Sequence, residues 1–383
     1  MRAYRVKTVL IICVSIIWEL SLLITLSACS CGNKLNNEDE KLIFKEEPSA
    51  RELKYYRAVP HDLVLIYDGG AHRSVRWNKA HFAPYVSATV KGEGKWLFDG
   101  FLFLEIHDGL GRGFASGYEK KGARKVEWEN LLKNYFARGN GIDALNQQIK
   151  EVSVRGGIGG DFTKRKVVLC VPEPIPGQVD WGEINGRPLR FSNKDDRLEA
   201  CRWYIDRALE LFRDAGFEHV ELSGFYWLAE EATNSRSLAG DVADYIYEKE
   251  YDFYWIPYFN SDGYSEWKNL GFNVPYYQPN YFFNESVPYS RLQEACDRAG
   301  KTGMNMEMEF DDRALANNKG WGYRLRDYLD VYEKNGVFDS LKVAWYQGGD
   351  AFYKLSLSGD EADLVLYRRI TELITRRAEN GFR

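Results

Sequence analysis

Two glutamates alternate with methionines in the segment Met304–Phe310. Asn305, Glu307 and Glu309 occupy every second position of this segment. Successive side chains of a β-strand point to opposite faces, so the three polar groups would share the face opposite the apolar set, which must face the helices. Buried carboxylates need hydrogen-bond partners or shifted pKa values, which are properties of catalytic acids and nucleophiles. A structural pair bonded to an inward Arg or Tyr is the alternative, and the position at the end of a strand favours a functional role.

Eight short apolar runs of strand length must position these acids. The runs are rich in β-branched and aromatic residues and alternate with amphipathic, helix-like segments. The strand candidates are Leu63–Tyr67, Leu97–Ile106, Val167–Val171, Val220–Trp227, Asp252–Tyr258, Val274–Gln278, Met304–Phe310 and Leu341–Tyr346. The helix candidates are Glu127–Phe136, Lys194–Ala215, Ser237–Tyr247, Tyr289–Ala299, Gly322–Tyr332 and Glu361–Ala378, with a short helix within Gly263–Leu270.

Eight alternations of this kind indicate parallel strands joined by crossover helices. We predict an α/β fold, a (β/α)8 TIM barrel in a single domain, because the count is eight and about 325 residues suit an embellished barrel. A doubly wound sheet is the rival. The glycine-rich stretch Gly109–Gly113 follows a strand but lacks the spacing of a dinucleotide fingerprint. The long interval between the second and third strands predicts an elaborated loop.

The active site of such a barrel is built from the carboxyl ends of the strands and the loops after them. Carboxylates, amides and aromatic rings crowd this predicted rim, and aromatic residues make up 15% of the chain. Flat rings with apolar faces and polar edges suit sugar rings, so the rim predicts a carbohydrate cleft. The predicted substrate-binding residues are Asp68, His107, Glu173, Tyr226, Trp227, Tyr258, Asn260, Gln278, Asn280, Tyr281, Glu307, Trp345 and Gln347.

A carboxylate after the fourth strand, together with Glu309 at the end of the seventh, resembles the clan of retaining (β/α)8 glycosidases. The resemblance implies that Glu230 (or its neighbour Glu231) is the acid/base and Glu309 the nucleophile. That clan usually has Asn directly before the acid/base, whereas Ala229 and Glu230 precede the two candidates here. Carboxyl groups about 5–5.5 Å apart would give retention, and about 6.5–9.5 Å inversion. We expect Asn280, Gln278 or Tyr258 to hydrogen-bond Glu309, with Glu307 deeper on the same strand.

Three segments, Gly224–Glu230, Tyr276–Phe283 and Glu307–Asp312, are also similar to an uncharacterised family of bacterial lipoproteins with a domain of unknown function. The resemblance covers most of residues 60–383. It implies the barrel fold and a surface location, without an established activity.

The amino terminus resembles a bacterial lipoprotein signal. Arg2 and other basic residues precede the apolar run Val9–Leu26, which ends in Leu26–Cys29. We expect residues 1–28 to be a signal peptide, Cys29 to be lipidated, residues 29–58 to be a polar tether and residues 59–383 to form the barrel. The alternative is an uncleaved membrane anchor, which Glu19 inside the apolar run disfavours. The expected location is the bacterial outer membrane, lipid-anchored, on the periplasmic or cell-surface side.

Composition excludes several other functions. A net charge of −5, from 51 basic and 56 acidic residues, argues against nucleic acid or an anionic lipid surface as the main partner. The five histidines include no closely spaced pair, so we expect no metal site. No Gly-x-Ser-x-Gly elbow is present. We expect no cofactor.

The leading hypothesis is a surface-anchored glycoside hydrolase that cleaves a glycan with two carboxylates. The alternative is a non-catalytic glycan-binding lipoprotein that works with partners in a polysaccharide uptake system. A structural lipoprotein without a ligand would leave the polar rim without a purpose.

Overall fold

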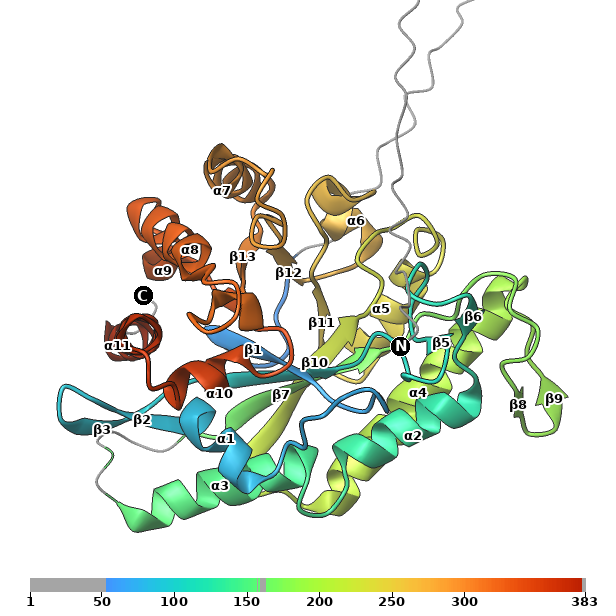
Figure 1. The fold of residues 1–383 in the computed structure, drawn as a ribbon. Helices are drawn as coiled ribbons and strands as arrows, with labels where there is room; N and C mark the ends of the chain where they lie inside the picture. Colours follow the sequence, from blue (N-terminus) through green and yellow to red (C-terminus); the bar gives the residue numbers. More distant parts are fainter. Residues whose placement is uncertain (1–52, 157, 159–162, 381–383) are drawn as a thin grey trace, which may run out of the picture. The chain divides into compact units, whose positions relative to one another are not determined.

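The eight predicted strands close into a barrel of parallel strands in the computed structural model, which describes residues 53–156, 158 and 163–380 (Figure 1). The first strand pairs with both the second and the last, as Leu63 lies beside Gly100 on one side and Ala344 on the other. Neighbouring strands follow the order of the chain, which confirms the predicted (β/α)8 fold. The barrel strands are β1 (Asp62–Tyr67), β4 (Gly100–Leu104), β7 (Arg165–Val171), β10 (Val220–Trp227), β11 (Asp252–Trp255), β12 (Val274–Tyr277), β13 (Asn305–Glu309) and β14 (Val343–Tyr346).

Helices cover the outside of the barrel (Figure 1). They are α1 (Lys79–Val86), α2 (Lys125–Tyr135), α3 (Gly141–Arg155), α4 (Lys194–Ala215), α5 (Ala239–Glu248), α6 (Trp267–Leu270), α7 (Ser290–Thr302), α8 (Gly322–Lys334), α9 (Val337–Ser340), α10 (Ala351–Ser356) and α11 (Glu361–Asn380). The six long predicted helices and the short α6 are present. Small two-stranded sheets decorate the loops: β2–β3 (Ser87–Val90, Glu93–Trp96), β5–β6 (Arg112–Gly113, Lys121–Gly122) and β8–β9 (Glu183–Ile184, Arg187–Pro188).

The interval between β4 and β7 differs from the predicted loop because it contains α3 in addition to α2. Ile142, Leu145, Ile149 and Val152 are buried at helical spacing along α3. This period was present in the sequence and indicated a helix. The missed α1 contains Pro84, a residue that disfavours a helix interior.

Helix α4 shows why local sequence predicted the elements well. The Asn193 side chain accepts a hydrogen bond from the Asp195 amide at 2.8 Å and caps the helix start. Gly216 ends the helix with a φ of 59°, a left-handed conformation that suits glycine. Cys201 and Ile205 are buried on its inner face. Both ends of the predicted helix therefore match the structure.

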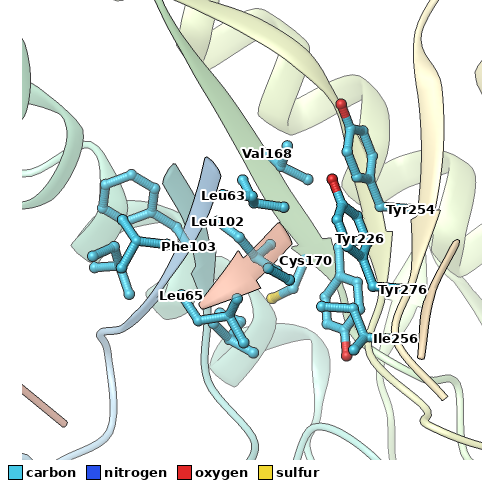
Figure 2. Close-up of a cluster of buried hydrophobic side chains, with 14 of the residues drawn as sticks. Leu63, Leu65, Leu102, Phe103, Val168, Cys170, Tyr226, Tyr254, Ile256 and Tyr276 are labelled. Carbon is cyan, nitrogen blue, oxygen red and sulfur yellow. The ribbon is translucent and has the colours of Figure 1, made fainter. Parts of the chain in front are cut away.

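The barrel interior is an apolar and aromatic core (Figure 2). Leu63 and Leu65 of β1 lie in one buried cluster with Tyr226, Tyr254 and Tyr276 of the opposite strands (Figure 2). Packed layers of this kind fill a TIM barrel, so chemistry is confined to the carboxyl ends of the strands.

Gly224 lets β10 pack closely against β11. A Cβ at this position would lie 2.2 Å from the Asp252 carbonyl oxygen and 2.7 Å from the Tyr254 ring. The glycine in β10 thus makes room for an inward tyrosine of the neighbouring strand.

The predicted signal peptide, Cys29 and the tether up to residue 52 lie outside the described residues. Across the ranges that are described, none of the helices combines the length and the apolar character needed to cross a membrane.

Candidate active site

Strand β13 carries Glu307 and Glu309 into the barrel mouth. Asn305 lies beside Tyr276 in register, so the two glutamates share the face of Tyr276, which belongs to the interior cluster (Figure 2). They are 2% and 1% exposed, and Met306 and Met308 are buried on the opposite face. The alternation along the sequence therefore places two carboxylates inside the barrel at the end where active sites form.

Three hydrogen bonds hold the Glu309 carboxylate. The Asn280 backbone amide donates to Oε2 at 2.7 Å, the Asn280 side chain donates to Oε1 at 3.2 Å, and the Tyr328 hydroxyl donates to Oε2. Burial raises the pKa of Glu309 to about 7, while the bonds from Tyr328 and Asn280 favour the ionised form and oppose that rise. The site therefore supports an anion at Glu309 despite its burial.

The Glu307 carboxylate receives no hydrogen bond from any residue within the described part of the chain. Burial first, and then the charges of Glu309 and Glu230, raise its pKa well above the ordinary value. Tyr226 and Tyr346 also face this group, and neither is a cation. Because two carboxylates this close cannot both ionise easily, Glu307 is the member of the pair that keeps its proton at neutral pH.

Glu307→Gln should make the protein more stable than the native chain at pH 8, and about equally stable at pH 5. Glu307 has a folded pKa raised above its unfolded value, so its contribution to stability is complete at low pH and is lost as pH rises towards the folded pKa. A neutral amide does not titrate. The difference in Tm should grow with pH to a few degrees, measured by calorimetry. A difference that is constant from pH 5 to pH 8 would show that Glu307 does not hold a proton.

Glu230 follows β10 and is half-buried at the barrel mouth. Its Oε2 accepts from the Tyr118 hydroxyl at 3.2 Å and its Oε1 from the Gln278 amide at 3.1 Å. Burial raises the pKa of Glu230, and these two hydrogen bonds oppose the rise. A raised pKa is a property that a general acid needs.

Two amides connect Glu230 to Glu309. Gln278 donates to Glu230, its own carbonyl oxygen accepts from the Asn280 side chain at 3.0 Å, and Asn280 donates to Glu309. Asn280 adopts a φ of 50°, a left-handed conformation that Asn tolerates. The chain of hydrogen bonds fixes both carboxylates relative to one scaffold, as a two-carboxylate mechanism requires.

The structure separates the two acid/base candidates. Glu231 accepts a hydrogen bond from the Tyr258 hydroxyl at 2.6 Å, so Tyr258 serves this neighbour instead of Glu309. Of the two neighbours, Glu230 is the one that is bonded to Gln278 and so to the network of Asn280 and Glu309. Glu230 is therefore the better candidate for the acid/base.

Several residues at the mouth were missed by sequence reasoning. Arg73 forms a double ion pair with the fully buried Glu105, with both distances 2.7 Å, and stacks over the Tyr67 ring at 4.8 Å. The rings of Tyr67 and Tyr346 pack in a T-shaped arrangement, with their centroids 5.7 Å apart. Glu105 had a signal, as a carboxylate inside the second apolar run. Tyr118 and the helical Tyr328 come from distant segments without a local pattern.

Trp227 and Trp345 pack into the fold outside the barrel lumen, which corrects their predicted place in the cleft. The Trp227 indole donates to Ser235 at 2.8 Å. The Trp345 indole donates to Asp62 at 2.9 Å, and its ring stacks on Phe338 of α9. Both tryptophans are 1% exposed or less because adjacent strand residues alternate, and Tyr226 and Tyr346 take the inward positions.

Four other predicted contact residues have structural partners. Gln347 is fully buried and bonded to Tyr85 and to the Leu65 carbonyl. The Tyr281 hydroxyl donates to Asp327 at 2.6 Å. Asn260 is exposed and bonded to Arg298 of α7. The ring of His107 stacks on His72, with centroids 4.1 Å apart. None of these contacts brings the four side chains to the Glu230–Glu309 network.

Glu173 and Asp68 are buried carboxylates at the ends of β7 and β1. The Ser116 amide donates to Glu173 at 2.7 Å, and burial raises the pKa of Glu173. Asn140 donates to Asp68 at 3.2 Å, and burial raises the pKa of Asp68 to about 6. Glu173 lies near Glu231, whereas Asp68 lines a separate cavity.

No group of three His, Cys, Asp or Glu side chains comes together as a metal site within residues 53–156, 158 and 163–380.

Comparison with known proteins identifies one family and several distant structures. The family described as "Domain of unknown function (DUF4855)" matches residues 62–372. No curated protein matches the chain. A mutant tryptophan synthase alpha-subunit from Pyrococcus furiosus is 10% identical, with a TM-score of 0.37, covering 84% of this chain and 99% of that chain. The carboxyl transferase domain of Rhizobium etli pyruvate carboxylase is 9% identical, with a TM-score of 0.38, covering 85% and 49%. An endo-1,4-beta-xylanase from Caldicellulosiruptor owensensis is 14% identical, with a TM-score of 0.32, covering 58% and 81%.

Proposed function

This chain belongs to the DUF4855 family, and we propose that it is a glycoside hydrolase that cleaves a glycan with Glu230 as acid/base and Glu309 as nucleophile. In the proposal Cys29 carries a lipid that anchors the enzyme to the bacterial outer membrane. Glu230 follows the fourth strand of the barrel, β10, and Glu309 is the last residue of the seventh, β13.

One observation carries the proposal: two buried carboxylates with different environments face one mouth and share one hydrogen-bond scaffold. Glu309 has three donors that favour its anion. Burial raises the pKa of both groups, but Glu230 is the more accessible of the two and accepts two hydrogen bonds, from Tyr118 and Gln278. Two carboxyl groups in different environments at one mouth are the arrangement that glycosidic hydrolysis uses.

The reaction follows from these roles. Glu309 attacks the anomeric carbon while Glu230 gives its proton to the departing glycosidic oxygen, so a glycosyl–Glu309 ester forms as the glycosidic bond breaks. Water then attacks the same carbon, gives a proton to the Glu230 carboxylate and releases Glu309. Asn280 and Tyr328 hold Glu309 throughout, and Gln278 and Tyr118 orient Glu230. The configuration of the sugar is retained.

Tyr328→Phe should shift the acidic limb of the pH–rate profile upward. Activity requires ionised Glu309, so it should fall as pH decreases through about 7. The Tyr328 hydroxyl lowers the pKa of Glu309, and its removal should raise that pKa by about one unit. The profile of kcat/KM against pH measures the shift.

Tyr332→Phe is the matched control, because its hydroxyl lies one helical turn further along α8 and donates to the Glu307 backbone carbonyl. Equal shifts in the two variants would mean that loss of packing, and not the bond to Glu309, changes the profile.

The function is tested by incubating the purified protein with plant, mucin and microbial glycans and measuring new reducing ends. The Glu309→Gln variant is run alongside. We expect release by the native protein and none by the variant. Binding without release by either protein would instead favour a non-catalytic glycan-binding lipoprotein.

A further inference from the structure

A polar cavity of about 500 Å³ has Arg73 in its lining, and Arg73 stacks over Tyr67, which lies near Glu230 of the proposed catalytic mouth. Its walls are the loop after β1, the loop after β4, and α2 with the loop that follows it. Arg73 belongs to this cavity and also stacks over Tyr67, so the Arg73–Tyr67 stack forms the boundary between the cavity and the mouth. The volume falls within the range of ordinary ligand pockets.

The acidic residues of this cavity already accept hydrogen bonds from other groups of the protein. Asp68 accepts from Asn140 at 3.2 Å. Asp108 accepts from the backbone amides of Leu110 and Arg112 at 2.7 and 2.9 Å. Glu127 accepts two bonds from the Arg124 guanidinium, at 2.6 and 3.0 Å. Only Glu127 of the three is paired with a cation, and no ion pair joins any of the three to Arg76 or Arg138 in the described part of the chain.

Three arginines line the cavity, and they differ in whether an acidic side chain is bonded to them. Arg73 is held by Glu105 through two bonds. Arg76 and Arg138 are exposed and line the same cavity. Neither guanidinium forms a hydrogen bond or an ion pair with a side chain in the described part of the chain. Two planar guanidinium groups without a carboxylate partner are suited to bind a ligand that carries an anionic group.

The remaining residues that line the cavity could contact the hydroxyl groups and the apolar face of a sugar. Asn130 and Asn134 present amides that can bond hydroxyl groups, and Phe114, Val75 and Leu110 add apolar surface. Leu110 is 81% exposed at the tip of its loop. Convergent polar groups on an apolar wall are typical of small-molecule sites.

We propose that this cavity is a subsite for an anionic sugar residue, one that carries a carboxylate or a sulfate, recognised by Arg76 and Arg138. The inference rests on the proposed function, because it assigns an acidic glycan as the substrate class of the neighbouring active site. The acidic residue would lie beyond the cleaved bond, across the Arg73–Tyr67 stack. The substrate is then a chain of several sugars instead of a small glycoside.

The test uses the full chain carrying Glu309→Gln, so that binding is measured without hydrolysis. Calorimetry compares hexagalacturonic acid, a sulfated galactan hexasaccharide and neutral maltohexaose. We expect at least one anionic oligosaccharide to bind more tightly than the neutral one, with an affinity that falls with added salt. Tighter binding of hexagalacturonic acid would identify the anionic group as a carboxylate, and tighter binding of the sulfated galactan would identify it as a sulfate.

Arg76→Ala and Arg138→Ala should each weaken binding of that anionic oligosaccharide about ten-fold, and the double variant about a hundred-fold. Arg326→Ala, at an exposed arginine of α8 outside the cavity, should leave the affinity unchanged. Anionic binding that survives the double variant, or equal binding of all three oligosaccharides, overturns the proposal. Arginine-dependent binding in a protein that hydrolyses no glycan would keep the subsite and reject the hydrolase, whereas hydrolysis of neutral glycans alone would do the reverse.

Discussion

Glu309→Gln should reduce glycan hydrolysis by at least about 10⁴-fold while leaving substrate binding nearly intact. The amide keeps the shape of the side chain and can still accept from Asn280 and Tyr328, but it cannot form a glycosyl ester. The loss should therefore appear in kcat and not in KM. Initial rates on the best substrate from the glycan screen measure both constants.

Azide should restore part of the activity of Glu309→Ala. A small anion can occupy the space left by the carboxylate and attack the anomeric carbon, which gives a glycosyl azide of inverted configuration.

Asp312→Asn is the matched control for Glu309→Gln, because Asp312 lies three residues further on and pairs with Lys354 away from the network. If Asp312→Asn loses as much activity as Glu309→Gln, the effect belongs to the loop and the role of Glu309 is wrong.

Glu230→Gln should slow hydrolysis of natural glycosidic bonds by about 10²- to 10⁴-fold, the usual contribution of a general acid. The loss should be much smaller with an aryl glycoside whose leaving group needs no proton. Glu231→Gln supplies the comparison, since Glu231 bonds Tyr258 and lies outside the Glu230–Gln278–Asn280–Glu309 network. The rates of Glu230→Gln and Glu231→Gln on the natural glycan and on the aryl glycoside decide which of the two residues is the acid/base. A leaving-group dependence in Glu231→Gln and none in Glu230→Gln would exchange their roles.

The order of elements was predictable because period and caps are local properties. Helix α4 has an Asn cap, an apolar face and a terminal glycine, and its predicted bounds match the structure. Strand β13 has strict alternation, so the shared face of Glu307 and Glu309 followed from the sequence. Helix α3 has the same kind of signal, because its buried apolar residues recur at helical spacing, and it replaces part of the predicted loop.

The orientation of the aromatic residues was not predictable in the same way. The run Phe225–Trp227 is apolar on both faces, because barrel strands are buried against the interior and against the helices. Without a polar face there is no alternation of polar and apolar residues, so the sequence does not show which of Tyr226 and Trp227 points into the barrel and which points towards the helices. The structure turns Tyr226 inward and Trp227 outward.

The supporting residues of the site come from segments that are distant in the chain. Tyr118 lies in the loop after β4, and Tyr328 lies on α8, yet each bonds a carboxylate of the mouth. Which of Glu230 and Glu231 faces Gln278 depends on the backbone path after β10, where no regular period applies. These contacts are tertiary, and only the folded barrel brings them together.

The central claim is that Glu309 forms a covalent bond to sugar, and trapping that bond tests it most directly. The native protein is incubated with the 2-deoxy-2-fluoro aryl glycoside of the sugar found by the screen, and a Glu230→Gln sample is treated in parallel. Peptide mass spectrometry of the fragment that contains β13 separates Glu309 from Glu307. We predict one sugar per chain, attached to Glu309. A sugar attached to Glu230, Glu231 or Glu307, or rapid turnover with inverted product and no adduct, would contradict the proposed mechanism.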